Sequence, residues 1–368
     1  MLALLGGAWD VAAWAFVALL LVVAASRRVG GTAPALLQPL QAVVPLLFLP
    51  IYLVLAGAIL GRRWLLVGTA IVFALVHWFA LAPARGVDDK PYWLGRGAVI
   101  RVAEANVYEQ NPTMGATIEN LRAADADVVV LVEVTPDWDT AMAGAGLYAR
   151  YPYRIVEPFR GARGAAILSK LPITDVGHLT RNKLPLVDVA LPNGQTVRIV
   201  AVHPPPPLSG SGSARGWTED LSVLRRYAGR TEGPLALVGD FNGTRWQPAF
   251  GSLLRSGLRD AHEATGHGLS YSWPADRFRP FARLDHALVS QELFPTAVTE
   301  LALPGSDHRG FVATLELRSR TQPGASGGAD LPASTGPGFN QRSFDCRMMK
   351  VALPLPRSGD DHGVACLE

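Results

Sequence analysis

Short polar clusters follow apolar runs at six places in the chain, and their side chains could carry acid–base chemistry. The clusters are Ala105-Asn106-Val107, Leu131-Val132-Glu133, Val202-His203-Pro204, Gly239-Asp240-Phe241-Asn242, Arg283-Leu284-Asp285-His286 and Ser306-Asp307-His308. Imidazole can give or take a proton near neutrality because its unperturbed pKa is about 6.5. A carboxylate such as Glu133, which ends an apolar run, costs free energy to bury unless it binds something positive.

Each cluster alone also has an ordinary structural explanation. Glu133 could be a solvated loop residue, and Asp240 with Asn242 could form a turn, since both residue types favour Asx-turns. Asp307 and His308 could be a structural ion pair. The presence of all six clusters in one chain favours a functional site over six separate accidents.

The segments that precede these clusters are short, rich in Val, Ile and Leu, and bounded by turn residues, which predicts strands. The predicted strands are at residues 98–102, 128–132, 165–168, 197–202, 235–238 and 287–289, and the predicted helices are at residues 114–124 and 217–227. Mixed strands with interspersed helices predict an α/β or α+β layered fold, with chemistry on the loops at strand ends.

Residues 1–84 contain three apolar stretches, at about residues 8–26, 41–60 and 64–81. Each approaches the roughly 20 residues that a helix needs to cross a membrane. We expect three membrane-spanning helices, with a buried helical hairpin as the alternative, and Pro45 and Pro50 favour a kinked or re-entrant middle segment. A linker at 85–96 then leads to a domain at 97–318. Residues 319–368 are expected to be disordered, because they are rich in Gly, Ser, Pro and Thr without periodicity.

The charges of the expected domain are balanced, because residues 97–318 hold 22 Lys/Arg and 23 Asp/Glu. A protein that grips DNA through its phosphates usually has a basic face, so this balance does not favour that class. The two cysteines, Cys346 and Cys366, both lie beyond the domain. A disulfide framework and a cysteine-based zinc site are therefore excluded within residues 97–318.

The order of the clusters resembles the endonuclease/exonuclease/phosphatase superfamily, which includes deoxyribonuclease I-like nucleases, neutral sphingomyelinases and inositol-polyphosphate 5-phosphatases. The matching strings are NV at Asn106, LVEV around Glu133, RGAAILSK from Arg163, VH at His203, GDFN at Asp240, RLDH at Asp285 and SDH at Asp307. They occur in the family's order across residues 97–318, and GDFN and SDH are the most specific. The resemblance implies an α/β (α+β) four-layer sandwich, in which two packed mixed β-sheets are flanked by helices.

The resemblance also implies a metal site and an acid–base pair. Glu133, with Asn106 nearby, would hold Mg²⁺ or Mn²⁺ through oxygen ligands, which hard cations prefer. Asp307 would help to position the metal and would orient His308. His308 would be the general base or would stabilise the transition state, and Asp240 would polarise the attacking water.

On the leaving-group side, the resemblance makes His203 the general acid and Asp285 the carboxylate that orients it. Asn242 would donate a hydrogen bond to a phosphoryl oxygen, and Arg163 would lie near the substrate. The chain departs from the family at Tyr108, where many members carry an acidic residue. We therefore expect a single metal ion.

The predicted anchor is the best indication of the substrate, because it would hold the site near lipid head groups. Bacterial members with several N-terminal spans are similar, including the group linked to vancomycin and teicoplanin resistance. That similarity implies a lipid-linked phosphate or pyrophosphate of the cell envelope. It also implies a catalytic domain outside the cytoplasm, which we expect, although the basic residues beside the spans, five against two, favour the cytoplasmic face. A membrane-tethered nuclease and a degenerate, non-catalytic binding module are the alternatives.

Overall fold

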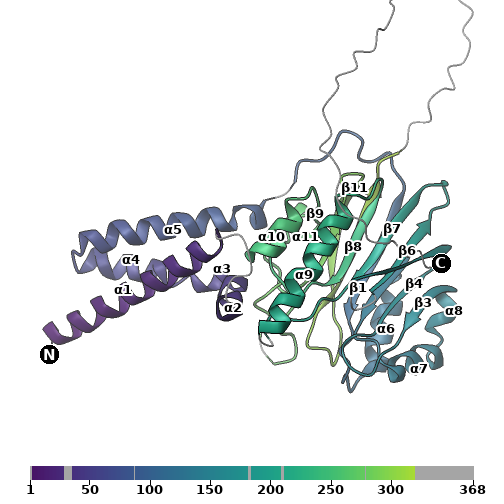
Figure 1. The fold of residues 1–368 in the computed structure, drawn as a ribbon, viewed down its shortest axis with the longest axis horizontal. Coiled ribbons are helices and arrows are strands. Elements are labelled where there is room, and N and C mark those ends of the chain that lie inside the picture. Colours follow the sequence, from purple (N-terminus) through teal and green to yellow (C-terminus); the bar gives the residue numbers. More distant parts are fainter. Residues whose placement is uncertain are drawn as a thin grey trace, which may run out of the picture. The chain divides into compact units, whose positions relative to one another are not determined.

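Two six-stranded β-sheets form the centre of the computed structural model, which describes residues 2–28, 35–86, 88–180, 184–208, 211–277 and 279–319 (Figure 1). The first sheet has the order β11-β12-β1-β2-β4-β3 and the second the order β5-β6-β7-β8-β10-β9. Each contains one parallel pair, β1 with β2 and β7 with β8, among antiparallel pairs, so both sheets are mixed.

The strands of the first sheet are β1 (Val99–Asn106), β2 (Val128–Val132), β3 (Tyr153–Glu157), β4 (Ala165–Ser169), β11 (Leu293–Leu301) and β12 (Gly310–Leu317). Those of the second are β5 (Ile173–Leu179), β6 (Leu184–Ala190), β7 (Thr196–Val202), β8 (Leu235–Asp240), β9 (Arg259–Asp260) and β10 (Asp285–Val289).

Helices cover the outer face of each sheet and complete four layers. Side chains of α6 (Met114–Ala124), α7 (Pro136–Gly144) and α8 (Leu147–Arg150) pack on the first sheet. Side chains of α9 (Ser211–Ala228) and α10 (Pro248–Leu254) pack on the second sheet, and the short helix α11 (Ala261–Ala264) follows β9. The predicted fold class, two packed mixed sheets flanked by helices, is confirmed.

Side chains that alternate along each strand point in turn to the core between the sheets and to the face that the helices cover. On β1, Ile100 and Val102 belong to the core between the sheets, whereas Ala103 and Ala105 pack with the helices of the first sheet. Because both faces of the central strands are covered, β2 is a run of five fully buried Val and Leu residues.

The sequence pattern locates the central elements better than the edges. Predicted segments 128–132 and 114–124 coincide with β2 and α6, and the remaining predicted segments overlap β1, β4, β7, β8, β10 and α9. The pattern does not predict β3, β5, β6, β9, β11 or β12, which lie at or next to the edges of the two sheets. Strand β5 is mostly exposed and therefore carries little apolar signal, and β6 and β11 contain Pro185 and Pro295, which argue against a strand interior.

In the N-terminal region, two helices are long and apolar enough to cross a membrane: α1 (Leu2–Ser26), from Gly7 onward, and α5 (Trp64–Arg85). The middle segment is divided among α2 (Gln38–Ala42), α3 (Val44–Leu47) and α4 (Ile51–Leu60), after the 3₁₀ turn Ala35–Leu37. Pro45 lies in the first turn of α3, and Pro50 is the residue before α4. The described residues therefore do not bear out a third helix of full spanning length at residues 41–60.

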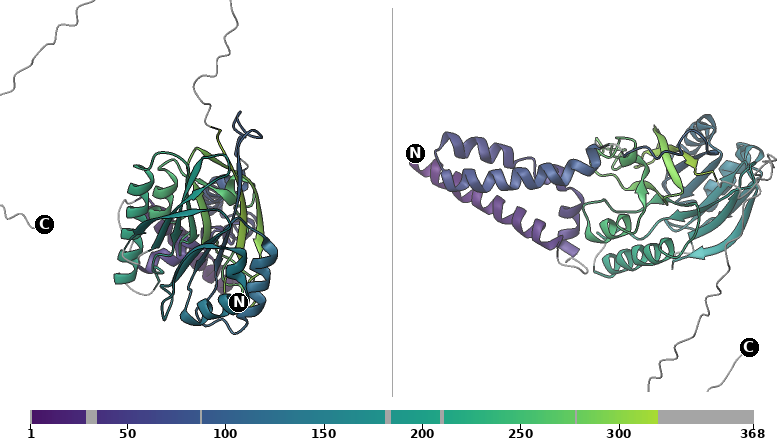
Figure 2. Two further views of the ribbon diagram at one scale, coloured as in Figure 1. Left: turned by 90° about the vertical axis from the view of Figure 1, so that its right-hand side faces the viewer. Right: turned by 90° about the horizontal axis from the view of Figure 1, so that it is seen from above.

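Helices α1, α4 and α5 lie side by side in Figure 1 and in the right-hand view of Figure 2, and they share an apolar cluster that includes Leu20, Ile51 and Ala70. Near the start of α1, Asp10 forms an ion pair with Arg63 at 2.9 Å. The basic residues that follow α1 and those that precede α5 thus lie at opposite ends of α1. The side of a membrane on which each end would lie stays a prediction.

Strand β8 needs glycine at the position that precedes the catalytic candidate Asp240. Gly239 has φ +150°, and a Cβ atom there would lie 2.0 Å from the carbonyl oxygen of Val202 on β7. The parallel pairing of β7 and β8 therefore excludes any side chain at this position. The close approach also fixes where β8 ends relative to His203, which directly follows β7.

We predict that Gly239→Ala lowers the free energy of unfolding by more than about 2 kcal/mol, because the added methyl group must displace backbone. Gly233→Ala is the matched control: Gly233 also has positive φ, +92°, but nothing lies within 4 Å of an added Cβ. Gly233→Ala should lower the free energy of unfolding by about 1 kcal/mol. Denaturant unfolding of the full-length protein in detergent measures both, and equal losses would contradict the close approach of β7 and β8.

Candidate active site

The candidate site residues continue the rows of side chains that face the space between the sheets. On β8 the inward-facing Val238 is followed two positions later by Asp240, and on β7 Ala201 is followed by His203. Side chains two residues apart on a strand share a face. Asp285, at the start of β10, lies opposite Asp240 in the antiparallel register. The polar residues thus gather at one end of the inter-sheet core.

Asn106 connects the two sheets at this end. Its Nδ2 lies 2.9 Å from Oε1 of Glu133, which follows the neighbouring strand β2, and 3.1 Å from Oδ2 of Asp240 in the other sheet. The orientation of the amide is set by Tyr108, whose backbone N–H donates to Oδ1 of Asn106. The backbone N–H of Glu109 donates to Oε2 of Glu133. Asn106 therefore presents a donor, not an oxygen ligand, to the two carboxylates.

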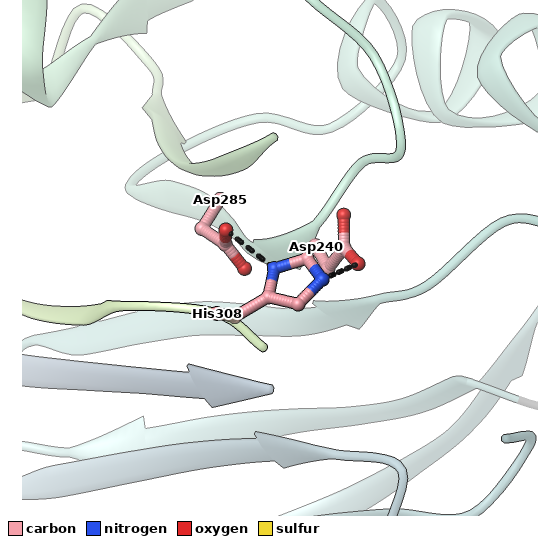
Figure 3. A group of neighbouring side chains, drawn as sticks. All are labelled: Asp240, Asp285 and His308. Atoms are coloured by element: carbon pink, nitrogen blue, oxygen red, sulfur yellow. Dashed lines mark hydrogen bonds and ion pairs between the residues drawn. The ribbon is translucent and has the colours of Figure 1, made fainter. Parts of the chain in front are cut away.

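His308 lies between two aspartates (Figure 3). Its Nδ1 is 2.9 Å from Oδ2 of Asp285, and its Nε2 is 3.6 Å from Oδ2 of Asp240. Ser306 fixes the loop that carries His308, because its hydroxyl accepts from the backbone N–H of His308 and donates to the carbonyl of Asn106. The imidazole is thereby positioned by protein groups from three strands, namely Asp285 on β10, Asp240 on β8 and, through Ser306, Asn106 on β1.

His203 and Asn242 complete the cluster on the side of the second sheet. Nε2 of His203 lies 3.7 Å from both Oε1 of Glu133 and Oδ2 of Asp240. The backbone N–H of Asn242 donates to Oδ1 of Asp240 at 2.7 Å, and its side-chain amide donates to the carbonyl of Pro204. Glu133 and Asn242 adopt left-handed backbone conformations, with φ of +63° and +48°. Such conformations cost free energy in non-glycine residues and are concentrated at functional sites.

Burial and the neighbouring charges set the protonation of this cluster. Burial disfavours the charged ring of His308, but Asp285 and Asp240 raise the pKa of His308 well above its ordinary value. Burial likewise opposes ionisation of Asp285, yet the charge and hydrogen bond of His308 hold the pKa of Asp285 below its usual range. Burial raises the pKa of Asp240. The result is an imidazolium–carboxylate pair beside a carboxylate that takes up a proton more readily than an exposed one.

Glu104 lies two residues before Asn106 on β1, and it is completely buried. Neither of its carboxyl oxygens has a hydrogen-bond partner among the described residues. Burial, reinforced by the charges of Asp285 and Asp240, raises the pKa of Glu104 well above its ordinary value. Glu104 therefore takes up a proton far more readily than an exposed glutamate does.

The donor set fits a hard divalent cation. Oε1 of Glu133 and Oδ2 of Asp240 approach the same amide nitrogen of Asn106 and the same ring nitrogen of His203. Carboxylate oxygens gathered in this way are what Mg²⁺ and Mn²⁺ prefer. Ligand atoms of Asp240, Asp285 and His308 also lie within 4.8 Å of one another. Because Asp285 is fully buried and bonded to His308, we regard Glu133 and Asp240 as the better candidates for metal ligands.

Two expected pairings are wrong. Asp285 was expected to orient His203 and Asp307 to orient His308, but it is Asp285 that bonds to His308. The carboxylate of Asp307 instead accepts from the indole N–H of Trp273 at 3.2 Å. Side-chain partners across two sheets depend on how the sheet ends meet, which strand-end motifs alone do not specify. Asp307 does line the same cavity as the catalytic candidates, and its role towards a metal stays a prediction.

Arg163 lies at the margin of the site. Its guanidinium stands 4.5 Å from the centre of the Phe159 ring, and the side chain is exposed while lining the same cavity. A cation at this place can meet an anionic substrate without being desolvated first. The structure therefore brings Arg163 to the site without placing it in contact with the central cluster.

Several supporting residues carry no sequence signal or only a weak one. Nδ1 of His286 lies 2.6 Å from Asp260, and its Nε2 lies 3.1 Å from the carbonyl oxygens of Gly243 and Arg283. His286, which belongs to the RLDH string, thus connects strand β10 with the loop that follows the GDFN string and with β9. His286 and Arg283 belong to the RLDH string, so their motif could have indicated them, whereas Trp273 belongs to no motif.

A sequence profile described as the Endonuclease/Exonuclease/phosphatase family matches residues 103–308. No curated protein sequence matches the chain. Among solved structures, an endonuclease/exonuclease/phosphatase from Beutenbergia cavernae is 20% identical, with coverage of 60% of this chain and 72% of that chain and a TM-score of 0.46.

Two further solved structures are similar at comparable levels. Truncated Caenorhabditis elegans TDP2 is 18% identical over 59% of this chain and 98% of its own, with a TM-score of 0.48. Sphingomyelinase C from Streptomyces griseocarneus is 18% identical over 59% and 99%, with a TM-score of 0.44. The profile match covers more than half of the chain and includes the candidate residues from Asn106 to His308. The chain belongs to the Endonuclease/Exonuclease/phosphatase family.

Proposed function

We propose that the chain is a membrane-anchored, metal-dependent phosphoesterase that hydrolyses a phosphoester or pyrophosphate bond of a lipid-linked envelope substrate. The observation that carries the proposal is the pairing of His308 with Asp285 at 2.9 Å, beside Asp240 and Glu133 in one cavity. This arrangement supplies a proton acceptor, fixed cationic and amide donors, and carboxylates for a divalent cation.

Hydrolysis would proceed by attack of a water oxygen on phosphorus, with breakage of the bond to the leaving oxygen. Asp240 would orient the attacking water and accept its proton. His308, held as the imidazolium by Asp285, would donate to the phosphoryl oxygens as negative charge builds on them. His203 would give its proton to the leaving oxygen. Asn242 would donate to the phosphoryl group after exchanging its hydrogen bond to Pro204.

Glu133 and Asp240 would hold Mg²⁺ or Mn²⁺, with Asp307 as a further candidate ligand. The bound cation would supply positive charge that offsets the charge of the phosphoryl group. Asn106 would keep the two carboxylates together through its single amide nitrogen, as it does in the structure.

The lipid-linked substrate is supported by the surface of the N-terminal helices. Leu53, Leu60, Leu65 and Phe79 are each 69% or more exposed. Large apolar side chains exposed in such number on one group of helices are typical of an interaction with a membrane or another apolar partner. A pyrophosphate or phosphate on a lipid would therefore reach the site with its apolar part in the same layer as the helices. This is the substrate class implied by the resemblance to the vancomycin- and teicoplanin-resistance group.

We predict that purified full-length protein in detergent hydrolyses polyprenyl pyrophosphate, with release of phosphate, or a phospholipid, with release of a phosphomonoester, when Mg²⁺ is present and not with EDTA. His308→Ala should lower kcat/KM by about 10²–10⁴-fold, because it removes the fixed donor. Glu133→Gln should raise the Mg²⁺ concentration needed for half-maximal rate by at least about tenfold. Glu119→Gln, which changes an exposed acid on α6, is the matched control and should behave as the wild type.

Comparable cleavage of DNA in the same assay would favour a membrane-tethered nuclease instead. Absence of metal-dependent turnover on every phosphoester tested would favour the non-catalytic binding module.

We also predict that Asp285→Asn destabilises the protein in a pH-dependent way. The depressed pKa of Asp285 contributes stability that is present above the unfolded-state value of 3.8 and lost as pH falls. The raised pKa of His308 contributes stability that is present in full below 6.5 and lost as pH rises through the folded-state value. The loss of melting temperature in Asp285→Asn should therefore be largest near about pH 5 and should shrink towards about pH 3.

Thermal unfolding of both proteins in EDTA across this pH range measures the effect. Asp276→Asn, at an ion pair with the exposed Arg277, is the control and should show little pH-dependent change. A loss in Asp285→Asn that is constant with pH would contradict the charged pairing of Asp285 with His308.

A further inference from the structure

A cavity of 640 Å³ joins the catalytic candidates to the N-terminal helical region. Part of its lining comes from catalytic candidates, namely Glu133, His203, Asp240, Asn242 and His308. The rest is largely apolar and comes mainly from three segments, within residues 39–43, 204–208 and 273–284, and Ala162, Arg163, Gln247 and Asp307 also line the cavity. Residues 39–43 lie some 90 positions before the first catalytic carboxylate and belong to α2 and the turn that follows it.

The helical wall of this cavity is attached to the loop that follows the GDFN string. The hydroxyl of Thr244 donates to the carbonyl of Ala42 at 3.1 Å. The indole N–H of Trp246 donates to the carbonyl of Ala80 at 3.3 Å, and Arg27 donates to the carbonyl of Trp246 at 2.8 Å. Trp246 is only 3% exposed and belongs to the apolar cluster of the N-terminal helices. Hydrogen bonds and apolar packing thus hold the loop that follows Asp240 against the N-terminal helices, including residues 39–43 of the cavity wall.

The chemistry of the wall favours a hydrocarbon occupant over a polyanion. The carbonyl of Ala42 already accepts from Thr244, and the residues of this segment that line the cavity, Pro39, Ala42 and Val43, are all apolar. Among the described lining residues, Arg163 is the one Lys or Arg. A nucleic-acid strand brings a phosphate with every nucleotide and is held by several cations, which this lining lacks. An apolar chain, by contrast, gains from leaving water for such a wall.

We propose that residues 39–43 and 204–208 bind the hydrocarbon chain that adjoins the scissile phosphate. The N-terminal helical region is then part of the substrate site and selects the substrate, in addition to being an anchor. This inference rests on the proposed phosphoesterase function and deepens it, because it assigns substrate selection to a segment outside the family-matched residues 103–308.

The test uses the full-length protein in detergent with water-soluble p-nitrophenyl alkyl phosphates that carry methyl, butyl or octyl groups. In the wild type, kcat/KM should rise about two- to fourfold per added methylene until the cavity is filled. In Val43→Trp, which fills the cavity, the octyl-to-methyl ratio of kcat/KM should fall at least tenfold. Val72→Trp is the matched control, because Val72 is 57% exposed on α5 and does not line the cavity; it should keep the wild-type ratio.

A second variant and a binding measurement separate failure of this inference from failure of the proposed function. Val43→Ser removes apolar surface without added bulk, and it should also reduce the octyl-to-methyl ratio. In melting experiments, hexylphosphonate should stabilise the wild type more than methylphosphonate does, and both Val43 variants should lose that difference. If the wild type cleaves neither these diesters nor the polyprenyl pyrophosphate and phospholipid named above, the proposed function fails and phosphonate binding alone decides the inference. Unchanged ratios in both variants, or equal stabilisation by the two phosphonates, would overturn it.

Discussion

Asp240 and Asp285 face each other on the paired strands β8 and β10, and both carboxylates are shielded from water, as is Glu104 on the opposite sheet. Carboxylates so close together in a medium of low polarity repel one another and cannot all be ionised without compensation. The fold compensates by placing His308 between the two aspartates, and burial raises the pKa of Glu104, which favours its uncharged form. Glu133 and Asp307 line the cavity, and a cation that enters there would relieve the repulsion further.

This electrostatic constraint explains why the site needs both sheets. Asn106 and Glu133 come from the first sheet, and His203 and Asp240 come from the second. His308, which precedes β12 of the first sheet, lies beside Asp240 and Asp285 of the second sheet. The two sets of residues meet because the inward-facing rows of each sheet continue past the apolar core. The packing of the inter-sheet core therefore also determines how the site residues are arranged.

Sequence patterns predict the parts of this arrangement that are local. The short apolar runs of β2, β7 and β8 and the polar residues that follow them indicate which side chains lie where a buried strand meets a loop. They do not indicate pairings across the sheets, so Asp285 with His308 and Asp307 with Trp273 emerge only from the structure. The contribution of residues 39–43 to the cavity is also invisible in the sequence. Those residues appear there as an interrupted apolar stretch, and their contact with Thr244 spans 202 positions.

The central claim is that the carboxylates at this end of the sandwich bind a hard divalent cation. Electron paramagnetic resonance of Mn²⁺ titrated into the full-length protein tests it most directly, because free and bound Mn²⁺ give different signals. The account predicts one saturable site that Mg²⁺ displaces and whose affinity falls by at least about tenfold in Glu133→Gln, but not in Glu119→Gln. Equal binding by wild type and Glu133→Gln, or no saturable binding by the wild type, would contradict it.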